Sequence, residues 1–272
     1  MPASVNVTYP ADGVGLIAFA DPPRNFGSAE LAGKIMEAVE QVGDAGCRAF
    51  VLASDTPGYF IAHWSLQFII DRQGAIEAGG NRLPPPGKRI FEAISETPMI
   101  SIAANNGQAW GGGAELSWAC DLRIAGKSAT YGQPEVGLGI IPGAGGTTRL
   151  ARLIGPTKCL EMIVDGRPIE ASEALQLGAV NKVVPDEDLR DAAVAWAAHI
   201  AQWPAWSLEA CKRSLYEGQD LPPAAASRNE SQIFFDVAGR SDSLALMAEV
   251  QARYDQGLDS YDAIGLPRPD TV

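Results

Sequence analysis

Glycine is concentrated in one stretch of this chain, and that stretch restricts the possible folds more than any other feature. Eleven of the 29 glycines lie between Asn105 and Gly146. Three are consecutive, Gly111 to Gly113, and they follow an apolar run and open a helical pattern that includes Glu115. Glycine lets a backbone approach a ligand closely, and the first N–H groups of a helix have no partner within the helix. The pattern predicts a backbone site for an oxyanion or a phosphate.

Two common phosphate-binding motifs do not fit this stretch. No Gly-Lys-Ser/Thr follows the glycines, and the strand, turn and ribose carboxylate of a dinucleotide site are not met. A structural alternative is that the glycines allow close helix packing and that Glu115 only complements the helix dipole. On the glycines alone, the two interpretations stand about equally.

A second carboxylate, Glu135, favours the functional interpretation. It follows Pro134 and precedes a flexible apolar turn, twenty residues after Glu115. A carboxyl group in apolar surroundings resists ionisation, and two converging carboxylates have their pKa values driven apart. The pair therefore predicts one acid and one base near neutral pH.

Short apolar runs alternate with helical patterns in the first two thirds of the chain. Turn or charged residues bound each run, as expected of buried strands. Between the first two runs, apolar residues recur at helical spacing after Ser28, an expected N-cap. The pattern predicts an α/β fold with mainly parallel strands. The expected strands are Val14–Ala20, Ala49–Ala53, Met99–Ala104, Leu122–Ala125 and Ala179–Val184, and the expected later helices are Asp186–Gln202, Trp206–Glu217, Ala224–Ala238 and Ser241–Gln256.

Composition excludes several classes of protein. The 272 residues are 46% hydrophobic, enough for a substantial core, and the formal net charge is −12. So acidic a chain is a poor candidate for general binding to nucleic acid or anionic membranes. Four scattered cysteines and two histidines predict neither a disulfide framework nor a metal site. The N-terminal residues have no signal-peptide pattern and no apolar stretch is long enough to cross a bilayer, so we expect a cytoplasmic protein.

The linked central motifs resemble a known family. They begin at Asn106 with Asn-Gly-Gln-Ala-Trp-Gly-Gly-Gly-Ala-Glu-Leu, at Tyr131 with Tyr-Gly-Gln-Pro-Glu, and at Pro142 with Pro-Gly-Ala-Gly-Gly-Thr. They are similar to the signature of the crotonase, or enoyl-CoA hydratase/isomerase, superfamily, over nearly the whole chain. The resemblance implies a spiral of β-β-α units that binds an acyl-CoA in residues 1–200. It also implies a helical region, residues 201–272, that builds a homotrimer or a homohexamer.

The same resemblance implies roles for individual residues. The N–H groups of Trp64 and Gly112 would form an oxyanion hole for a thioester carbonyl. Glu115 would help to activate a water that attacks C3 of a trans-2-enoyl thioester, and Glu135 would deliver a proton to C2. Coenzyme A would be part of the substrate, with no separate cofactor. The implied substrate contacts are Arg24, Ala62, His63 and Gly111.

One loop departs from the family pattern. Where relatives usually have Gly-Ala-Asp, this chain has His63, Trp64 and Ser65. A non-glycine residue at position 63 could change the dihedral angles of the loop. His63 would supply a third titrating group or a phosphate contact, or, as the favoured interpretation, a hydrogen bond within the loop. Ser65 is expected to cap a helix over Leu66–Ile76.

Hydration of an enoyl-CoA in fatty acid metabolism is the leading functional hypothesis, because both glutamates are present. Double-bond isomerisation, thioester hydrolysis and lyase chemistry are alternatives, since loop 63–65 is unusual. A non-catalytic protein that binds acyl-CoA or RNA is a third, and the acidic charge disfavours RNA. Residues 79–88, with three glycines and three prolines, are interpreted as a surface connector.

Overall fold

The computed structural model describes residues 2–79 and 89–268, so the expected connector lies outside the described residues except for Gly79. The chain divides into two units, Met1–Ala205 and Trp206–Val272. The boundary at residue 200 stays a prediction.

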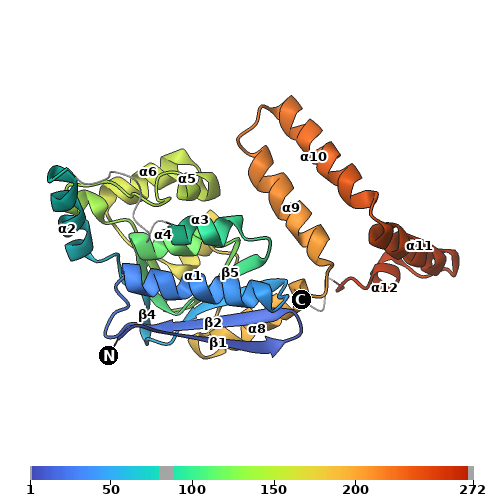
Figure 1. Cartoon of the computed structure of the whole chain (residues 1–272), viewed down its shortest axis with the longest axis horizontal. Coiled ribbons are helices and arrows are strands. Elements are labelled where there is room, and N and C mark those ends of the chain that lie inside the picture. Colours follow the sequence, from blue (N-terminus) through green and yellow to red (C-terminus); the bar gives the residue numbers. More distant parts are fainter. Residues whose placement is uncertain (1, 80–88, 269–272) are drawn as a thin grey trace. The chain divides into compact units, whose positions relative to one another are not determined.

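The first unit is built on a six-stranded sheet in the order β1-β2-β3-β5-β7-β10 (Figure 1). All neighbours from β2 to β10 are parallel, and β1 pairs with β2 in the antiparallel sense. The prediction of an α/β fold with mainly parallel strands is confirmed. The strands are β1 Ser4–Ala11, β2 Val14–Ala20, β3 Ala49–Ser54, β5 Ile100–Asn105, β7 Leu122–Gly126 and β10 Lys182–Val184.

A second sheet of four short strands has the order β4-β6-β8-β9. Its strands are β4 Gly58–Ile61, β6 Gly107–Trp110, β8 Thr130–Gly132 and β9 Ile169–Glu170. Three times the chain passes from the large sheet to the small sheet and then into a helical element, as β3-β4-α2, β5-β6-α4 and β7-β8-η2. These elements are α2 Leu66–Glu77, α4 Gly112–Ala119 and the 3-10 helix η2 Glu135–Leu138. This arrangement confirms the β-β-α spiral. The short strands are too brief to produce a clear alternating pattern, so the sequence did not predict them.

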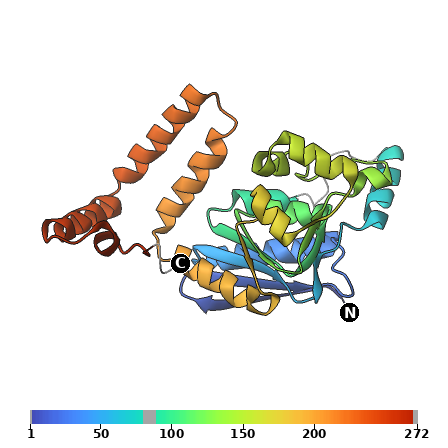
Figure 2. The same ribbon diagram turned by 180° about the vertical axis from the view of Figure 1, so that it is seen from behind.

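Both faces of the large sheet are buried. Phe50 and Leu52 of β3 pack with helix α1 (Ala29–Asp44), whereas the intervening Val51 packs with α8 (Leu189–Ile200). The two helices lie on opposite faces of the sheet (Figures 1 and 2). A strand covered on both sides buries the side chains of both its faces, which is why these strands are mostly apolar runs in the sequence, with buried exceptions such as Ser101 and Arg123.

Two predicted helix caps are confirmed. The Ser28 hydroxyl accepts the N–H of Leu31 at 3.1 Å and begins α1. The Ser65 hydroxyl accepts the N–H of Phe68 at 3.3 Å and begins α2.

Two elements are shorter in the structure than the sequence predicts. The strand expected over Ala179–Val184 is confined to β10, because the N–H groups of Ala179 and Val180 donate to the Ala174 carbonyl at the end of α7 (Ala171–Leu177). The helix expected from Asp186 begins with the 3-10 turn η3 Asp186–Asp188 before α8 starts at Leu189.

The second unit is helical, as predicted. Trp206 of α9 donates its indole N–H to the Ser243 hydroxyl of α11 at 3.1 Å. Phe234 and Phe235 of α10 are 62% and 69% exposed in the single chain. The helices are α9 Ala205–Gly218, α10 Pro223–Ala238, α11 Ser241–Asp255 and α12 Ser260–Ile264, and the remaining helices of the first unit are α3 Arg89–Glu96, α5 Arg149–Ile154 and α6 Pro156–Asp165.

Candidate active site

The three consecutive glycines form the turn between β6 and α4. Gly111 has a φ of 50°, a left-handed conformation that favours glycine, and its N–H donates to the Gly132 carbonyl of β8 at 2.8 Å. A side chain at Gly113 would begin 2.0 Å from the Ile61 carbonyl oxygen. Within residues 2–79 and 89–268, no backbone carbonyl accepts the N–H of Gly112. The glycines thus give α4 an N-terminus packed against β4, with a donor available at Gly112.

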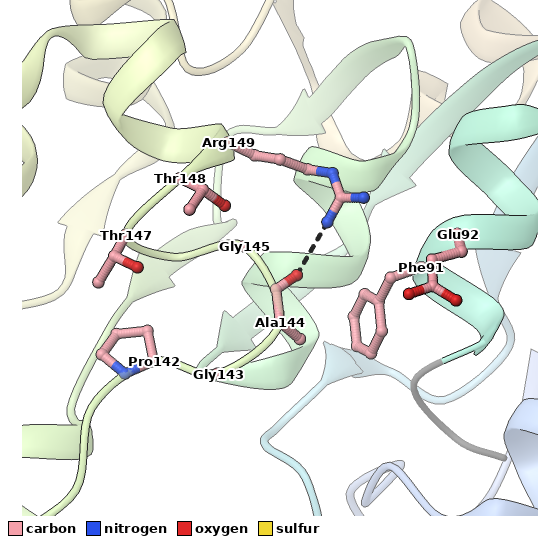
Figure 3. A pocket seen from close by; sticks show the side chains of 9 residues that line it. All are labelled: Phe91, Glu92, Pro142, Gly143, Ala144, Gly145, Thr147, Thr148 and Arg149. Carbon is pink, nitrogen blue, oxygen red and sulfur yellow. Dashed lines mark hydrogen bonds between the residues drawn. The ribbon is translucent and has the colours of Figure 1, made fainter. Parts of the chain in front are cut away.

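Glu115 lies in the first turn of α4 and is 3% exposed. Its Oε1 atom accepts the N–H groups of Ala144 at 2.7 Å and Gly146 at 2.8 Å. The Arg149 guanidinium donates to the Ala144 carbonyl at 3.0 Å, as the dashed line in Figure 3 shows. The 142–149 segment thus holds the carboxylate of Glu115.

Glu135 is the first residue of η2 and is 8% exposed. Burial raises its pKa from the ordinary value of 4.5 to about 7; its own backbone N–H lowers the pKa, and the charge of Glu115 raises it. This agrees with the expectation that apolar surroundings make Glu135 resist ionisation. The amide nitrogen of Gln133 donates to both carboxylate oxygens of Glu135, at 2.9 and 3.1 Å.

The two glutamates meet at the turn that opens α4. A Cβ atom on Gly111 would lie 2.8 Å from Oε1 of Glu135, and the Gly111 carbonyl accepts the N–H of Glu115 at 3.0 Å. Any side chain at position 111 would therefore displace Glu135. The structure brings together Gly111, Gly112, Glu115 and Glu135.

The loop after β4 reaches the same turn. The N–H of Gly27 donates to the His63 carbonyl and the N–H of Ser65 donates to the Gly27 carbonyl, both at 2.9 Å. This parallel bridge orients Trp64, whose own N–H has no backbone acceptor among the described residues. The Cβ of Trp64 lies 3.2 Å from where a Cβ of Gly112 would be. The two expected oxyanion donors are therefore neighbours.

His63 is held by its own loop. Its Nδ1 lies 2.8 Å from the Trp64 carbonyl oxygen, and since that oxygen can only accept, Nδ1 carries the proton. The ring also packs 4.6 Å from the Phe26 ring, centroid to centroid. Among the described residues, Asn25 is the one non-glycine residue with positive φ, so His63 does not strain the loop. These contacts support the hydrogen-bonded interpretation of His63.

Two other expected substrate contacts lie beside this loop. The N–H of Ala62 donates to the Arg24 carbonyl at 3.2 Å, and the Ala62 carbonyl accepts from the side-chain amide of Gln108 at 3.2 Å. Both backbone groups of Ala62 thus bond within the protein, while the Arg24 side chain is exposed. Their role toward a substrate stays a prediction.

Asn25 is a site-forming residue that the sequence reasoning missed. It is fully buried and has a φ of 52°. Its amide nitrogen donates to the Ser54 hydroxyl at 2.7 Å and to the Phe60 carbonyl at 2.9 Å, and its oxygen accepts the N–H of Asp21 at 2.6 Å. Asn25 therefore ties the end of β3 to β4 just before the Trp64 loop. The sequence carries no signal for this role.

A cavity of about 290 Å³ lies between α3 and the 142–149 segment (Figure 3). Phe91 and Glu92 line one side, and Ala144, Thr148 and Arg149 line the other. Ala144 is also one of the two N–H donors to Glu115, so the cavity borders the support of that carboxylate.

In the described part of the chain, no group of three or more His, Cys, Asp or Glu residues could hold a metal ion. No described helix combines the length and the hydrophobicity required to span a membrane.

Comparisons with known proteins agree on one family. The family model described as enoyl-CoA hydratase/isomerase matches residues 10–253, a range that includes both buried glutamates. Over 222 residues the chain is 35% identical to the glyoxysomal fatty acid beta-oxidation multifunctional protein MFP-a of Brassica napus, covering 80% of this chain and only 30% of that protein. Over 172 residues it is 37% identical to the short-chain-enoyl-CoA hydratase of Clostridium acetobutylicum, covering 63% of this chain and 66% of that protein. The crystal structure of an enoyl-CoA hydratase from Bacillus anthracis matches with a TM-score of 0.82 and 31% identity, covering 92% of this chain and 96% of that chain.

Proposed function

Because this chain belongs to the enoyl-CoA hydratase/isomerase family, we propose that it adds water to a trans-2-enoyl-CoA and forms a 3-hydroxyacyl-CoA. The observation that carries the proposal is the pair of buried carboxylates at the N-terminus of α4. Glu115 is anchored by two backbone N–H groups, whereas the pKa of Glu135 is raised to about 7. Groups with such different environments can act as base and acid in one reaction.

In the proposed reaction the thioester carbonyl accepts the N–H groups of Trp64 and Gly112. These donors stabilise the negative charge that develops on the carbonyl oxygen as a nucleophile adds to C3. Glu115 takes a proton from the attacking water while the water oxygen bonds to C3. Glu135 gives its proton to C2, which completes the addition, and a proton passed from Glu115 to Glu135 restores the starting state.

The substrate also supplies contacts outside the reacting atoms. Gly111 lies beneath the carboxylate of Glu135, and we assign Arg24, Ala62 and His63 to the walls that face the coenzyme A part of the substrate. Coenzyme A arrives with the acyl group, so the reaction needs no separate cofactor. The name of the Brassica napus relative supports a place in fatty acid β-oxidation.

The cellular setting completes the proposal. We propose residues 1–200 as the acyl-CoA-binding core and residues 201–272 as the region that forms a homotrimer or homohexamer in the cytoplasm. The exposed Phe234 and Phe235 support a further contact for this region, because large apolar side chains in water are unfavourable.

The test is a panel of acyl-CoA thioesters with products identified by mass spectrometry. We expect 2-enoyl-CoA to gain one water, with loss of the enoyl thioester absorbance. Glu115→Gln and Glu135→Gln should abolish the gain, whereas Glu96→Gln, an exposed glutamate on α3, should not. Double-bond migration, release of free coenzyme A or binding without turnover would replace the proposal with one of the other acyl-CoA functions.

A further inference from the structure

We propose that Gln133 is a positioning residue that directs a side-chain amide N–H at the Glu135 carboxylate and holds that carboxylate beside the loop that binds Glu115. The inference rests on the proposed function and adds a residue to it. Gln133 leaves β8 one residue after Gly132 and is fully buried. Burying an amide without partners is costly, so its hydrogen bonds define its role.

Gln133 contacts the carboxylate of Glu135 directly. The amide nitrogen of Gln133 lies 2.9 Å from one carboxylate oxygen and 3.1 Å from the other. One N–H shared between the two oxygens favours the ionised carboxylate, since a protonated carboxyl turns one of those oxygens into an O–H that the amide nitrogen cannot accept. Gln133 thus opposes both burial and the negative charge of Glu115, which raise the pKa of Glu135.

Gln133 also contacts the loop that binds Glu115. A Cβ atom on Gly146 would lie 2.9 Å from the amide carbon of Gln133, so this amide packs directly on the Gly146 backbone. The N–H of Gly146 in turn donates to Glu115 at 2.8 Å. One buried side chain therefore contacts the acid directly and supports the base through one glycine.

This placement has a consequence for the reaction. Glu135 must release its proton to C2 and later be protonated again, so neither charge state can be strongly favoured. The groups that bear on the charge of Glu135 are the Glu115 carboxylate, the Gln133 amide and its own backbone N–H. Among these, Gln133 is the one side chain that stabilises the ionised form.

The experiment compares wild type with Gln133→Met, an unbranched side chain without donors. The pH dependence of kcat/KM for hydration reports the free enzyme, and its alkaline limb reports the proton donor. We expect this limb to move to higher pH by about one unit in the variant, because hydrogen bonds to a charged group are lost. Gln41→Met, on the exposed face of α1, is the matched control and should leave the profile unchanged.

A second readout is independent of turnover. Infrared titration, with Glu135→Gln as the subtraction reference, follows the carboxyl band of Glu135 itself and should show the same displacement. If Gln133→Met does not fold, Gln133→Glu keeps the side-chain size and should move both readouts in the same direction, because it places a like charge beside Glu135. An unchanged infrared titration in a folded variant overturns the inference. A wild-type protein that adds no water, with the infrared displacement intact, overturns the proposed function alone.

Discussion

Replacing Glu135 by glutamine should make the protein more stable at alkaline pH while removing its activity. Glu135 holds its proton up to about pH 7 in the folded protein, whereas in an unfolded chain it ionises near its ordinary pKa of 4.5. The folded state is therefore favoured below about pH 4.5, and this stability is lost as the pH rises through about 7. Glutamine does not titrate, so the variant should escape the loss.

The size of the effect follows from the interval between the two pKa values. Each pH unit corresponds to about 1.4 kcal/mol, so an interval from 4.5 to about 7 sets an upper value of about 3.5 kcal/mol. Solvent screening reduces this to about 1–2 kcal/mol. This gain in the free energy of unfolding should therefore be measurable, although it is smaller than the change that most core substitutions cause.

The assay is urea unfolding of wild type and Glu135→Gln at pH 5 and pH 8.5, at one protein concentration because subunit association would affect stability. The free energy of unfolding of the variant relative to wild type should be larger at pH 8.5 than at pH 5 by about 1–2 kcal/mol. Glu96→Gln serves as the exposed control. Equal pH dependence in wild type and Glu135→Gln would refute the reasoning, since Glu135 would then have an ordinary pKa.

Three further substitutions test the geometry of the site. Glu115→Gln keeps an oxygen that can accept the loop N–H groups, so it should unfold like wild type in urea but hydrate enoyl-CoA about 100-fold or more slowly in the absorbance assay; wild-type rates would contradict its role. Gly111→Ala should lose about 1–2 kcal/mol of stability and most activity, because its φ is 50° and its Cβ would lie 2.8 Å from Glu135. Gly33→Ala, with open space at its Cβ in α1, should instead gain about 0.5–1 kcal/mol. Asn25→Ala should lower the free energy of unfolding by about 2–3 kcal/mol, since it leaves buried hydrogen-bonding groups unpaired, and an unchanged urea midpoint would rule out its proposed role in the loop.

Much of the fold could be predicted from local patterns. Strands β2, β3, β5 and β7 are mostly apolar because helices cover both faces of their sheet, and Ser28 and Ser65 cap helices with hydroxyls one turn away. A hydroxyl cap depends only on residues that are neighbours in the sequence. A strand buried on both faces is visible in the sequence as a run of apolar residues. The small sheet could not be predicted in this way, because strands of two to four residues carry no period of their own.

In the candidate site, too, the sequence indicates some features and leaves others to the tertiary structure. The glycine turn and the two glutamates are linked by motifs that the sequence displays, and the family resemblance supplied Trp64. What the sequence could not indicate is which groups set their chemistry. Asn25 acts across 29 residues on Ser54, and the N–H groups that hold Glu115 come from residues 29 and 31 positions away.

The sequence by itself determined an acidic α/β chain whose glycines and glutamates gather in one segment. Only the tertiary structure decided that Glu135 is buried beside Gln133 with a pKa of about 7. It also decided that the carboxylate of Glu115 accepts hydrogen bonds from two backbone N–H groups. Two identical side chains differ here because desolvation and hydrogen bonding depend on distances through space, and those distances exist only after the β-β-α units have packed.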